Sequence, residues 1–128
     1  MKKYILILVS IIMIIGLTGC VKKDMSYTQI SMEEAVAMMA TEENYIILDV
    51  RTTEEFAEKH IPSAMNIPNE TIGSEELEEL PDKNQLILVY CRSGNRSKQA
   101  SEKLVSLGYT NIYEFGGIND WTGELEYE

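Results

Sequence analysis

The hydrophobic pattern of the chain alternates between short apolar runs and longer amphipathic segments. Two continuous apolar runs, at 45–48 and 86–90, are typical of strands that are buried on both faces of a parallel sheet. Shorter segments with strand-forming residues lie at 27–30, 65–68 and 111–113. Segments with helix-capping starts or helical apolar spacing lie at 31–39, 52–56 and 97–107. The pattern predicts an α/β fold, with a central parallel sheet of about five strands and helices on both faces.

A glutamate-rich segment at 74–80 is interpreted as a solvated helix. Leu77 and Leu80 lie three residues apart on its apolar face. Charge runs of this kind are usually solvated, and the spacing is not that of a calcium loop, so no metal site is expected. A last short helix that carries Trp121 is expected after Gly116-Gly117. The two glycines are interpreted as required by the geometry of the backbone, and Trp121 is interpreted as a core residue.

The start of the chain resembles a bacterial lipoprotein signal peptide. A basic start precedes an uncharged apolar run at 4–17, which is shorter than the ~20 residues of a comfortable membrane span. The run ends in Leu17-Thr18-Gly19-Cys20, which resembles the lipobox whose cysteine is lipidated. We expect a signal peptide at 1–19, a tether at 20–26 lipidated on Cys20, and one domain at 27–128. An uncleaved anchor helix is the alternative, and both place the domain outside the cytoplasm, on the bacterial cell membrane.

The predicted mature chain is strongly acidic. Without Lys2 and Lys3 it has nine basic residues against 21 acidic ones. Such a surface repels nucleic acid and anionic lipid headgroups, so neither is an expected partner. Because salt screens this charge beyond about 10 Å, a small anionic substrate would be attracted only by local positive groups.

The strongest candidate for chemistry is Cys91, which directly follows the apolar run at 86–90. A short polar loop separates it from the predicted helix at 97–107, so backbone N–H groups should favour negative charge there. Arg92 and Arg96 add two positive charges within the same loop. We expect the thiol to lose its proton more readily than that of a free cysteine, and the thiolate is the nucleophile. The alternative is a buried, inert cysteine at a strand end.

These segments resemble a single-domain rhodanese, a thiosulfate sulfurtransferase. The resemblance covers roughly residues 27–121 and rests on these blocks in order: Leu48-Asp49-Val50-Arg51; Glu55-Phe56; His60-Ile61-Pro62-Ser63-Ala64 with Asn66-Ile67-Pro68; Tyr90-Cys91-Arg92-Ser93-Gly94-Asn95-Arg96-Ser97; and Gly108-Tyr109 with Gly116-Gly117-Ile118 and Trp121. Lys59 and Ser63 stand where the family often has glycine, so the loop around His60 is expected to differ in shape.

The resemblance implies two-step covalent sulfur transfer without a cofactor. The Cys91 thiolate would attack the outer sulfur of a small anionic donor such as thiosulfate, release sulfite, and pass sulfur from its persulfide to a thiol or cyanide-like acceptor. The resemblance also implies that Arg92 and Arg96 bind the anionic donor or acceptor, that Ser93, Gly94 and Asn95 shape the loop, and that Ser97 caps the helix. The residues name no particular donor, acceptor, protein partner or oligomeric state.

Asp49, Arg51 and His60 have supporting interpretations. Asp49 follows the strand predicted at 45–48, and the resemblance implies that it joins Arg51 in the network that holds the loops, with a catalytic role as the alternative. His60 is the only histidine. Because it precedes Ile61-Pro62, it is interpreted as fixing a turn by hydrogen bonding, with a Cys-His pair as the alternative.

Two other function classes fit parts of the pattern. Rhodanese-fold dual-specificity phosphatases also close a cysteine loop with arginine, but their loops are longer than the four residues that separate Cys91 from Arg96. The smaller loop favours sulfur over a phosphoryl group. A redox or partner-binding module is the second alternative. If Cys20 carries lipid, Cys91 is left as a single thiol, and such a thiol can be oxidised outside the cell.

Overall fold

The computed structural model describes residues 26–128. The predicted signal peptide and all but the last residue of the predicted tether lie outside the described residues, and so does Cys20. Within 26–128, none of the helices combines the length and the apolar character needed to cross a lipid bilayer.

Strands and helices alternate along the whole described part of the chain. The strands are β1 (Thr28–Gln29), β2 (Tyr45–Asp49), β3 (Met65–Asn66), β4 (Leu86–Cys91) and β5 (Ile112–Gly117). The α-helices are α2 (Met32–Thr41), α3 (Thr53–Glu58) and α4 (Asn95–Ser106), and two 3-10 helices are η1 (Asn69–Thr71) and η2 (Ile118–Asp120).

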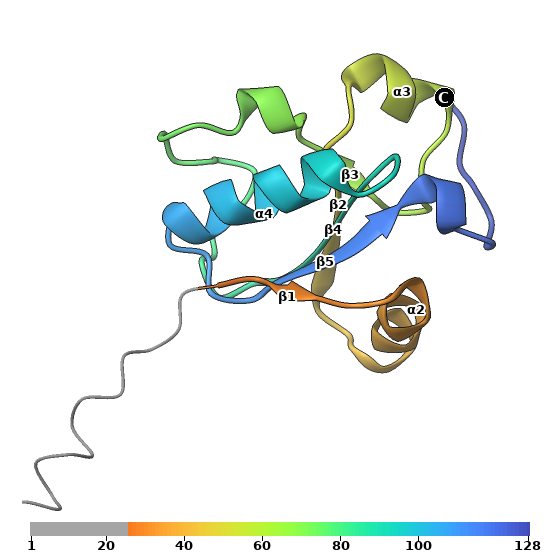
Figure 1. Ribbon diagram of the computed structural model, residues 1–128, viewed down its shortest axis with the longest axis horizontal. Helices are drawn as coiled ribbons and strands as arrows, with labels where there is room; N and C mark the ends of the chain where they lie inside the picture. Colours follow the sequence, from red (N-terminus) through yellow and green to blue (C-terminus); the bar gives the residue numbers. More distant parts are fainter. Residues whose placement is uncertain (1–25) are drawn as a thin grey trace, which may run out of the picture.

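The five strands form one parallel sheet in the order β1-β5-β4-β2-β3 (Figure 1). The central strand is β4, which ends at Cys91. Asp49 of β2 lies beside Tyr90, and Gly117 of β5 lies beside Cys91. Between Val89 and Cys91 the register shifts, because β5 uses one more residue than β4 over this stretch. The parallel sheet predicted from the sequence is confirmed.

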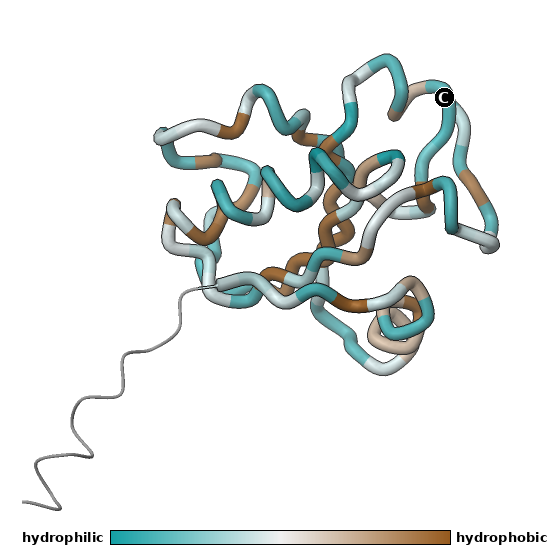
Figure 2. The backbone as a smooth tube through the Cα atoms, in the orientation of Figure 1, coloured by the Kyte–Doolittle hydropathy of each residue, from teal (hydrophilic) through white to brown (hydrophobic). Residues whose placement is uncertain are grey.

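An apolar core covers each face of the sheet. Successive residues of a strand point to opposite faces, so β4 contributes to both cores. Cys91 packs with Leu104 on the face covered by α4, whereas Tyr90 packs with Ala35 on the face covered by α2. Figure 2 shows apolar residues gathered along the central strands and polar residues along much of the outer helices. The prediction of helices on both faces is confirmed.

Capping boxes fix the starts of α2 and α3, as the sequence predicts. The Ser31 hydroxyl accepts a hydrogen bond from the Glu34 N–H (3.1 Å), and the Glu34 carboxylate accepts one from the Ser31 N–H (3.4 Å). Thr52 and Glu55 repeat the arrangement at the start of α3, at 3.2 and 3.4 Å. Each box satisfies two N–H groups that the helix leaves without partners.

The prediction of a helix at 74–80 is wrong, since this segment forms only bends and turns. Leu80 is buried and Leu77 packs against the same core. A turn in which the Leu80 N–H donates to the Leu77 carbonyl (3.1 Å) brings both leucines to the core without a helix. Glutamates three and four residues apart would repel one another along a helix, and Pro81 disfavours helical backbone at Leu80.

The last helix is shorter than predicted. It is η2, which ends at Asp120, so Trp121 follows the helix instead of lying within it. The Trp121 side chain is partly buried against the core on the α2 face, and its ring N–H donates to the Glu124 carbonyl (2.8 Å). Trp121 therefore covers the edge of the core and anchors the segment after η2.

Candidate active site around Cys91

Cys91 lies at the end of β4, beneath the loop that leads into α4. Its side chain is 1% exposed. The Gly94 N–H donates to the Cys91 Sγ at 3.0 Å, and the Ser97 Oγ lies 3.4 Å from the same sulfur. A backbone N–H that points at the sulfur stabilises negative charge there. The sulfur is buried at the edge of the apolar core that includes Leu104, but it also contacts a backbone N–H and a hydroxyl group, which a wholly apolar pocket would not supply.

The conformation of Gly94 shapes the loop. Gly94 is the N-cap of α4 and has a φ of 113°, a value that residues with a Cβ rarely adopt. The helix therefore begins at Asn95, two residues before the predicted start at Ser97. The prediction that Ser97 caps the helix is wrong: it lies in the first turn, and its hydroxyl turns inward, 3.0 Å from the Gly94 carbonyl.

Glu114 of β5 is a residue of this site that sequence reasoning missed. It is 2% exposed, and its Oε1 accepts hydrogen bonds from the Ser97 Oγ (2.8 Å) and the Gly116 N–H (2.9 Å). The β4–β5 register brings its side chain to the α4 face, where Cys91 also points. The signal in the sequence was a glutamate between the apolar residues Ile112 and Phe115.

Arg92 and Arg96 share an acidic partner, Glu55 of α3. Arg96 Nη1 and Nη2 donate to the two oxygens of Glu55 (2.7 and 3.1 Å), and Arg92 Nε donates to one of them (3.2 Å). The Arg96 side chain is 25% exposed and that of Arg92 is 56% exposed. The sequence indicated only the capping role of Glu55. Its negative charge offsets part of the positive charge that we expected in this loop.

The hydrogen bonds from Arg96 lower the pKa of Glu55 to about 2, with further lowering from Thr52 and partial opposition from burial. We expect Glu55→Gln to lower the free energy of unfolding by about 1–2 kcal/mol at pH 7. A lowered pKa stabilises the fold above the unfolded value of 4.5, and this contribution is lost as the pH falls through about 2.

Urea unfolding between pH 7 and pH 3 measures this contribution. Glu54→Gln is the matched control, because Glu54 is exposed in the same first turn of α3. The difference in the free energy of unfolding between Glu54→Gln and Glu55→Gln should stay constant from pH 7 down to about pH 5 and should shrink at lower pH. A difference that does not change with pH would contradict the ion pair as its source.

Asp49 and Arg51 form a buried ion pair on the other face of the sheet from Cys91. Arg51 Nη2 and Nε donate to Asp49 Oδ2 (2.7 and 3.1 Å), and Arg51 Nη2 also donates to the Lys59 carbonyl (2.6 Å). Burial, the largest influence, lowers the pKa of Arg51, but the hydrogen bonds and charge of Asp49 outweigh it and raise that pKa. The pair thus joins the end of β2 to the end of α3, as the network interpretation expects.

Tyr90 lies beneath this pair. The Arg51 guanidinium stands 5.8 Å from the centre of the Tyr90 ring, and the Tyr90 hydroxyl accepts a hydrogen bond from the Ile61 N–H (3.1 Å). Burial, and then the negative charge of Asp49, raise the pKa of Tyr90, so the phenol stays neutral.

His60 makes structural hydrogen bonds, as predicted, and does not pair with Cys91, but its ring joins the end of α3 to the C-terminal segment instead of holding the turn at 61–64. Its Nδ1 lies 2.9 Å from the Phe56 carbonyl and its Nε2 lies 3.1 Å from a Glu126 carboxylate oxygen. The ring also stacks on that of Phe56 at 3.8 Å. Ser63, one of the departures from the family pattern, has a φ of 67°, so serine here takes a conformation that favours glycine.

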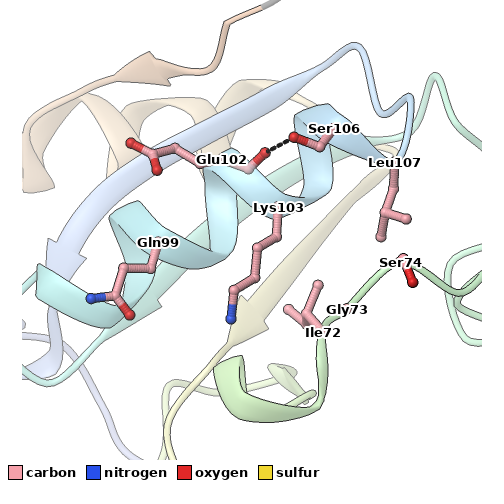
Figure 3. Close-up of a pocket in the computed structure, with 8 residues that line it drawn as sticks. All are labelled: Ile72, Gly73, Ser74, Gln99, Glu102, Lys103, Ser106 and Leu107. Atoms are coloured by element: carbon pink, nitrogen blue, oxygen red, sulfur yellow. Dashed lines mark hydrogen bonds between the residues drawn. The ribbon is translucent and has the colours of Figure 1, made fainter.

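Two hollows lie near the site. One of about 520 Å³ lies between α4 and residues 72–74, and Figure 3 shows the Lys103 side chain reaching across it. No residue of the Cys91 loop lines this hollow. The other, of about 110 Å³, lies beside the loop and is lined by Arg51, Glu58, Lys59, Arg92, Ile118 and Asn119. Three of these six side chains are basic and one is acidic, and Arg51 and Arg92 are already paired with Asp49 and Glu55.

Comparison with known proteins places the geometry in a family. The model of the Rhodanese-like domain family matches residues 31–124. The chain is 38% identical over 73 residues to the thiosulfate sulfurtransferase PspE of Escherichia coli K12, covering 57% of this chain and 70% of PspE. It is 33% identical over 98 residues to the thiosulfate sulfurtransferase GlpE of Actinobacillus succinogenes, covering 76% and 86% of the two chains.

A solved structure has the same fold. The rhodanese-like domain protein from Staphylococcus aureus is 31% identical with a TM-score of 0.68, over 79% of this chain and 98% of that one. The chain also spans 24% and 28% of two longer adenylyltransferase and sulfurtransferase proteins, from Candida albicans and Ogataea parapolymorpha. Only about a quarter of the length of those two proteins is therefore comparable with this chain.

Proposed function

The chain belongs to the rhodanese-like domain family, and we propose that this sulfurtransferase carries the transferred sulfur as a persulfide on Cys91. The observation that carries the proposal is the hydrogen bond from the Gly94 N–H to the Cys91 Sγ, 3.0 Å long, at the end of the central strand. A fixed N–H donor supports an anionic sulfur at this position both in the thiolate and in the persulfide.

The proposed reaction has two covalent steps. The Cys91 thiolate attacks the outer sulfur of an anionic donor such as thiosulfate, and sulfite leaves with the electron pair of the broken sulfur–sulfur bond. A thiol or cyanide-like acceptor then attacks the terminal sulfur, and the Cys91 thiolate is restored. The sulfur is transferred as sulfane sulfur in both steps, without net oxidation or reduction, so the cycle as written needs no external oxidant or reductant. The names of PspE and GlpE support thiosulfate as the donor class.

Arg92 and Arg96 are the proposed binding groups for the anionic donor. Both contact Glu55, so a donor that reaches them must compete with that carboxylate. Arg92 is the more exposed of the two and also lines the cavity of about 110 Å³. Arginine suits this role because its planar donor groups match the oxygens of an oxyanion. Ser93, Gly94 and Asn95 hold the turn that positions these groups.

Intact mass spectrometry of the purified protein after incubation with thiosulfate tests the proposal. We expect a mass gain of one sulfur on the wild type, release of that sulfur when cyanide is added, and no gain on Cys91→Ser. Failure of the wild type to gain sulfur would overturn the proposal.

The same samples separate the alternatives. Hydrolysis of an aryl phosphate that depends on Cys91, without sulfur transfer, would favour a phosphatase. Oxygen adducts on Cys91 without sulfur transfer would favour a redox module. The hydrogen bond to the Cys91 sulfur stabilises a thiolate in any of these function classes. Sulfur transfer is favoured by the thiosulfate sulfurtransferase relatives and by the short loop between Cys91 and Arg96.

We further propose that the domain lies outside the cytoplasm, anchored to the bacterial cell membrane through lipid on Cys20. The support is the sequence alone: a basic start, an apolar run at 4–17 and the lipobox-like end at 17–20. Membrane fractionation of cells that express the wild type or Cys20→Ser tests this proposal. Equal amounts of the two proteins in the membrane fraction would contradict it.

A further inference from the structure

Glu55 of α3 is the carboxylate that contacts both arginines of the cysteine loop. We propose that Glu55 selects the sulfur donor by its charge, favouring donors with one negative charge, such as a thiosulfonate, over dianions such as thiosulfate. This inference rests on the proposed sulfur transfer, and it assigns Glu55 as a specificity-determining residue for the loading of Cys91.

Glu55 occupies N–H groups that an oxyanion would otherwise use. Arg96 Nη1 and Nη2 donate to the two carboxylate oxygens, at 2.7 and 3.1 Å, and Arg92 Nε donates to Oε2 at 3.2 Å. A guanidinium binds the oxygens of an oxyanion through the same kind of paired N–H groups. The carboxylate of Glu55 therefore takes the place on Arg96 that the oxygens of a sulfur donor would take.

Arg92 keeps donor groups with which a substrate can bind. Glu55 contacts Arg92 only at Nε, so the Nη1 and Nη2 groups of Arg92 lie outside this contact, and the side chain is 56% exposed. Arg96 is also close to the sulfur: the hydrogen bonds of Glu55 are the main cause of the raised pKa of Arg96, and Cys91 contributes. A donor that binds here therefore feels the charges of both arginines and of Glu55.

The cluster of Arg92, Arg96 and Glu55 combines two positive charges with one negative charge. Glu55 stays ionised, because the hydrogen bonds from Arg96 lower its pKa to about 2, partly opposed by burial. A donor with one negative charge neutralises the cluster, whereas a dianion leaves an excess negative charge beside the Cys91 thiolate. The Glu55 side chain is 18% exposed, so solvent and salt screen this repulsion incompletely.

The other charges around the cluster do not replace the one that Glu55 cancels. In the cavity beside Arg92, Lys59 stands with the acidic Glu58, and Arg51 is paired with Asp49. On the other side, the exposed Glu70 adds a negative charge that acts on the cluster. Glu55 is the carboxylate in direct contact with the two arginines, so it has the largest effect on the charge that a donor meets.

The loading step is the same for both classes of donor. The Cys91 thiolate attacks the outer sulfur, the sulfur–sulfur bond of the donor breaks, and its electron pair leaves with sulfite or, from methanethiosulfonate, with methanesulfinate. The outer sulfur becomes the terminal sulfur of the persulfide in both cases. No other molecule gives or takes a proton or an electron, so the two donors can be compared directly.

The kcat/KM values of the full chain for thiosulfate and methanethiosulfonate, with cyanide as the acceptor, test this inference. Glu55→Gln should raise kcat/KM for thiosulfate about tenfold and that for methanethiosulfonate by about threefold or less. Dividing the first value by the second removes any difference in intrinsic reactivity between the donors. Glutamine keeps the size of the side chain and can still close the capping box with Thr52.

Two variants control this measurement. Glu54→Gln removes an exposed charge from the same turn of α3 and should leave the ratio of the two kcat/KM values within about twofold of the wild-type ratio. Arg92→Met leaves α3 unchanged and should lower the ratio at least threefold, roughly, because a dianion loses more from the missing positive charge. This second change keeps the inference testable even if Glu55→Gln does not fold.

The ratio separates charge selection from a merely structural role. If Glu55 only positioned the arginines, Glu55→Gln would slow both donors equally and leave the ratio unchanged, which would overturn the inference. The shift in the ratio should persist in about 0.5 M potassium chloride, since the contact is shorter than the screening length. A shift that disappeared there would assign it to the general acidity of the surface and would also overturn the inference. A wild type that gains no sulfur from either donor would instead overturn the proposed function.

Discussion

Arg51→Met is expected to lower the free energy of unfolding by about 3–5 kcal/mol at pH 7. The substitution leaves Asp49, which is fully buried, without the cation that contacts both of its oxygens. It also removes the donor to the Lys59 carbonyl, so the end of α3 loses its connection to β2. Urea unfolding followed by circular dichroism measures the loss.

Lys98→Met is the matched control for this prediction. It deletes one positive charge from an exposed position of α4 and should change stability by less than about 0.5 kcal/mol. If the two methionine variants lost equal stability, the buried pair would not be the source of the loss.

The sheet and two helix starts could be predicted because the necessary information is local. The apolar run that forms β4 is continuous, which is typical of a strand covered on both faces. Ser31 and Thr52 each stand three residues before a glutamate, and both pairs form capping boxes. The position of Cys91 at the end of a central strand follows from the same local pattern.

Competing local signals explain the two wrong predictions. Leu77 and Leu80 have helical spacing, but a turn satisfies the same burial while the neighbouring glutamates stay in solvent. Ser97 is a common capping residue, yet Gly94 takes that position because only a glycine readily adopts its φ of 113°. Once Gly94 ends the loop, the Ser97 hydroxyl is free to turn toward Cys91 and Glu114.

The acidic residues of the site could not be predicted, because their partners are far away in the sequence. Glu55 lies 41 residues before Arg96, and Glu114 lies 17 residues after Ser97. These contacts depend on the register of β5 and on the placement of α3 over the loop. The sequence thus indicated the nucleophile and its arginines, whereas the tertiary structure showed that Glu55 pairs with the arginines and that Glu114 contacts Ser97 beside Cys91.

Gly117→Ala is expected to slow sulfur loading of Cys91 by about 10²-fold. Gly117 lies beside Cys91 in the sheet, and an added Cβ would overlap the Arg92 carbonyl and come within 2.5 Å of the Ser93 nitrogen. Both contacts are backbone atoms, so the cysteine loop itself must move. That loop is also held by the Asn119 N–H, which donates to the Arg92 carbonyl (3.2 Å). Displacing it should weaken the hydrogen bond that the Gly94 N–H donates to the Cys91 sulfur.

Gly73→Ala separates the steric effect of Gly117→Ala from the general effect of replacing a glycine. No atom lies within 4 Å of the position that a Cβ would take at Gly73. This variant should load sulfur at the wild-type rate and gain a few tenths of a kcal/mol, roughly, from a less flexible unfolded chain. Gly117→Ala should instead lose about 1–3 kcal/mol of stability. Mass spectrometry at timed intervals measures both rates. A Gly117→Ala loading rate within twofold of the wild-type rate would contradict the prediction. Because the added Cβ forces the cysteine loop to move, such a rate would mean that this movement leaves the Cys91 sulfur undisturbed.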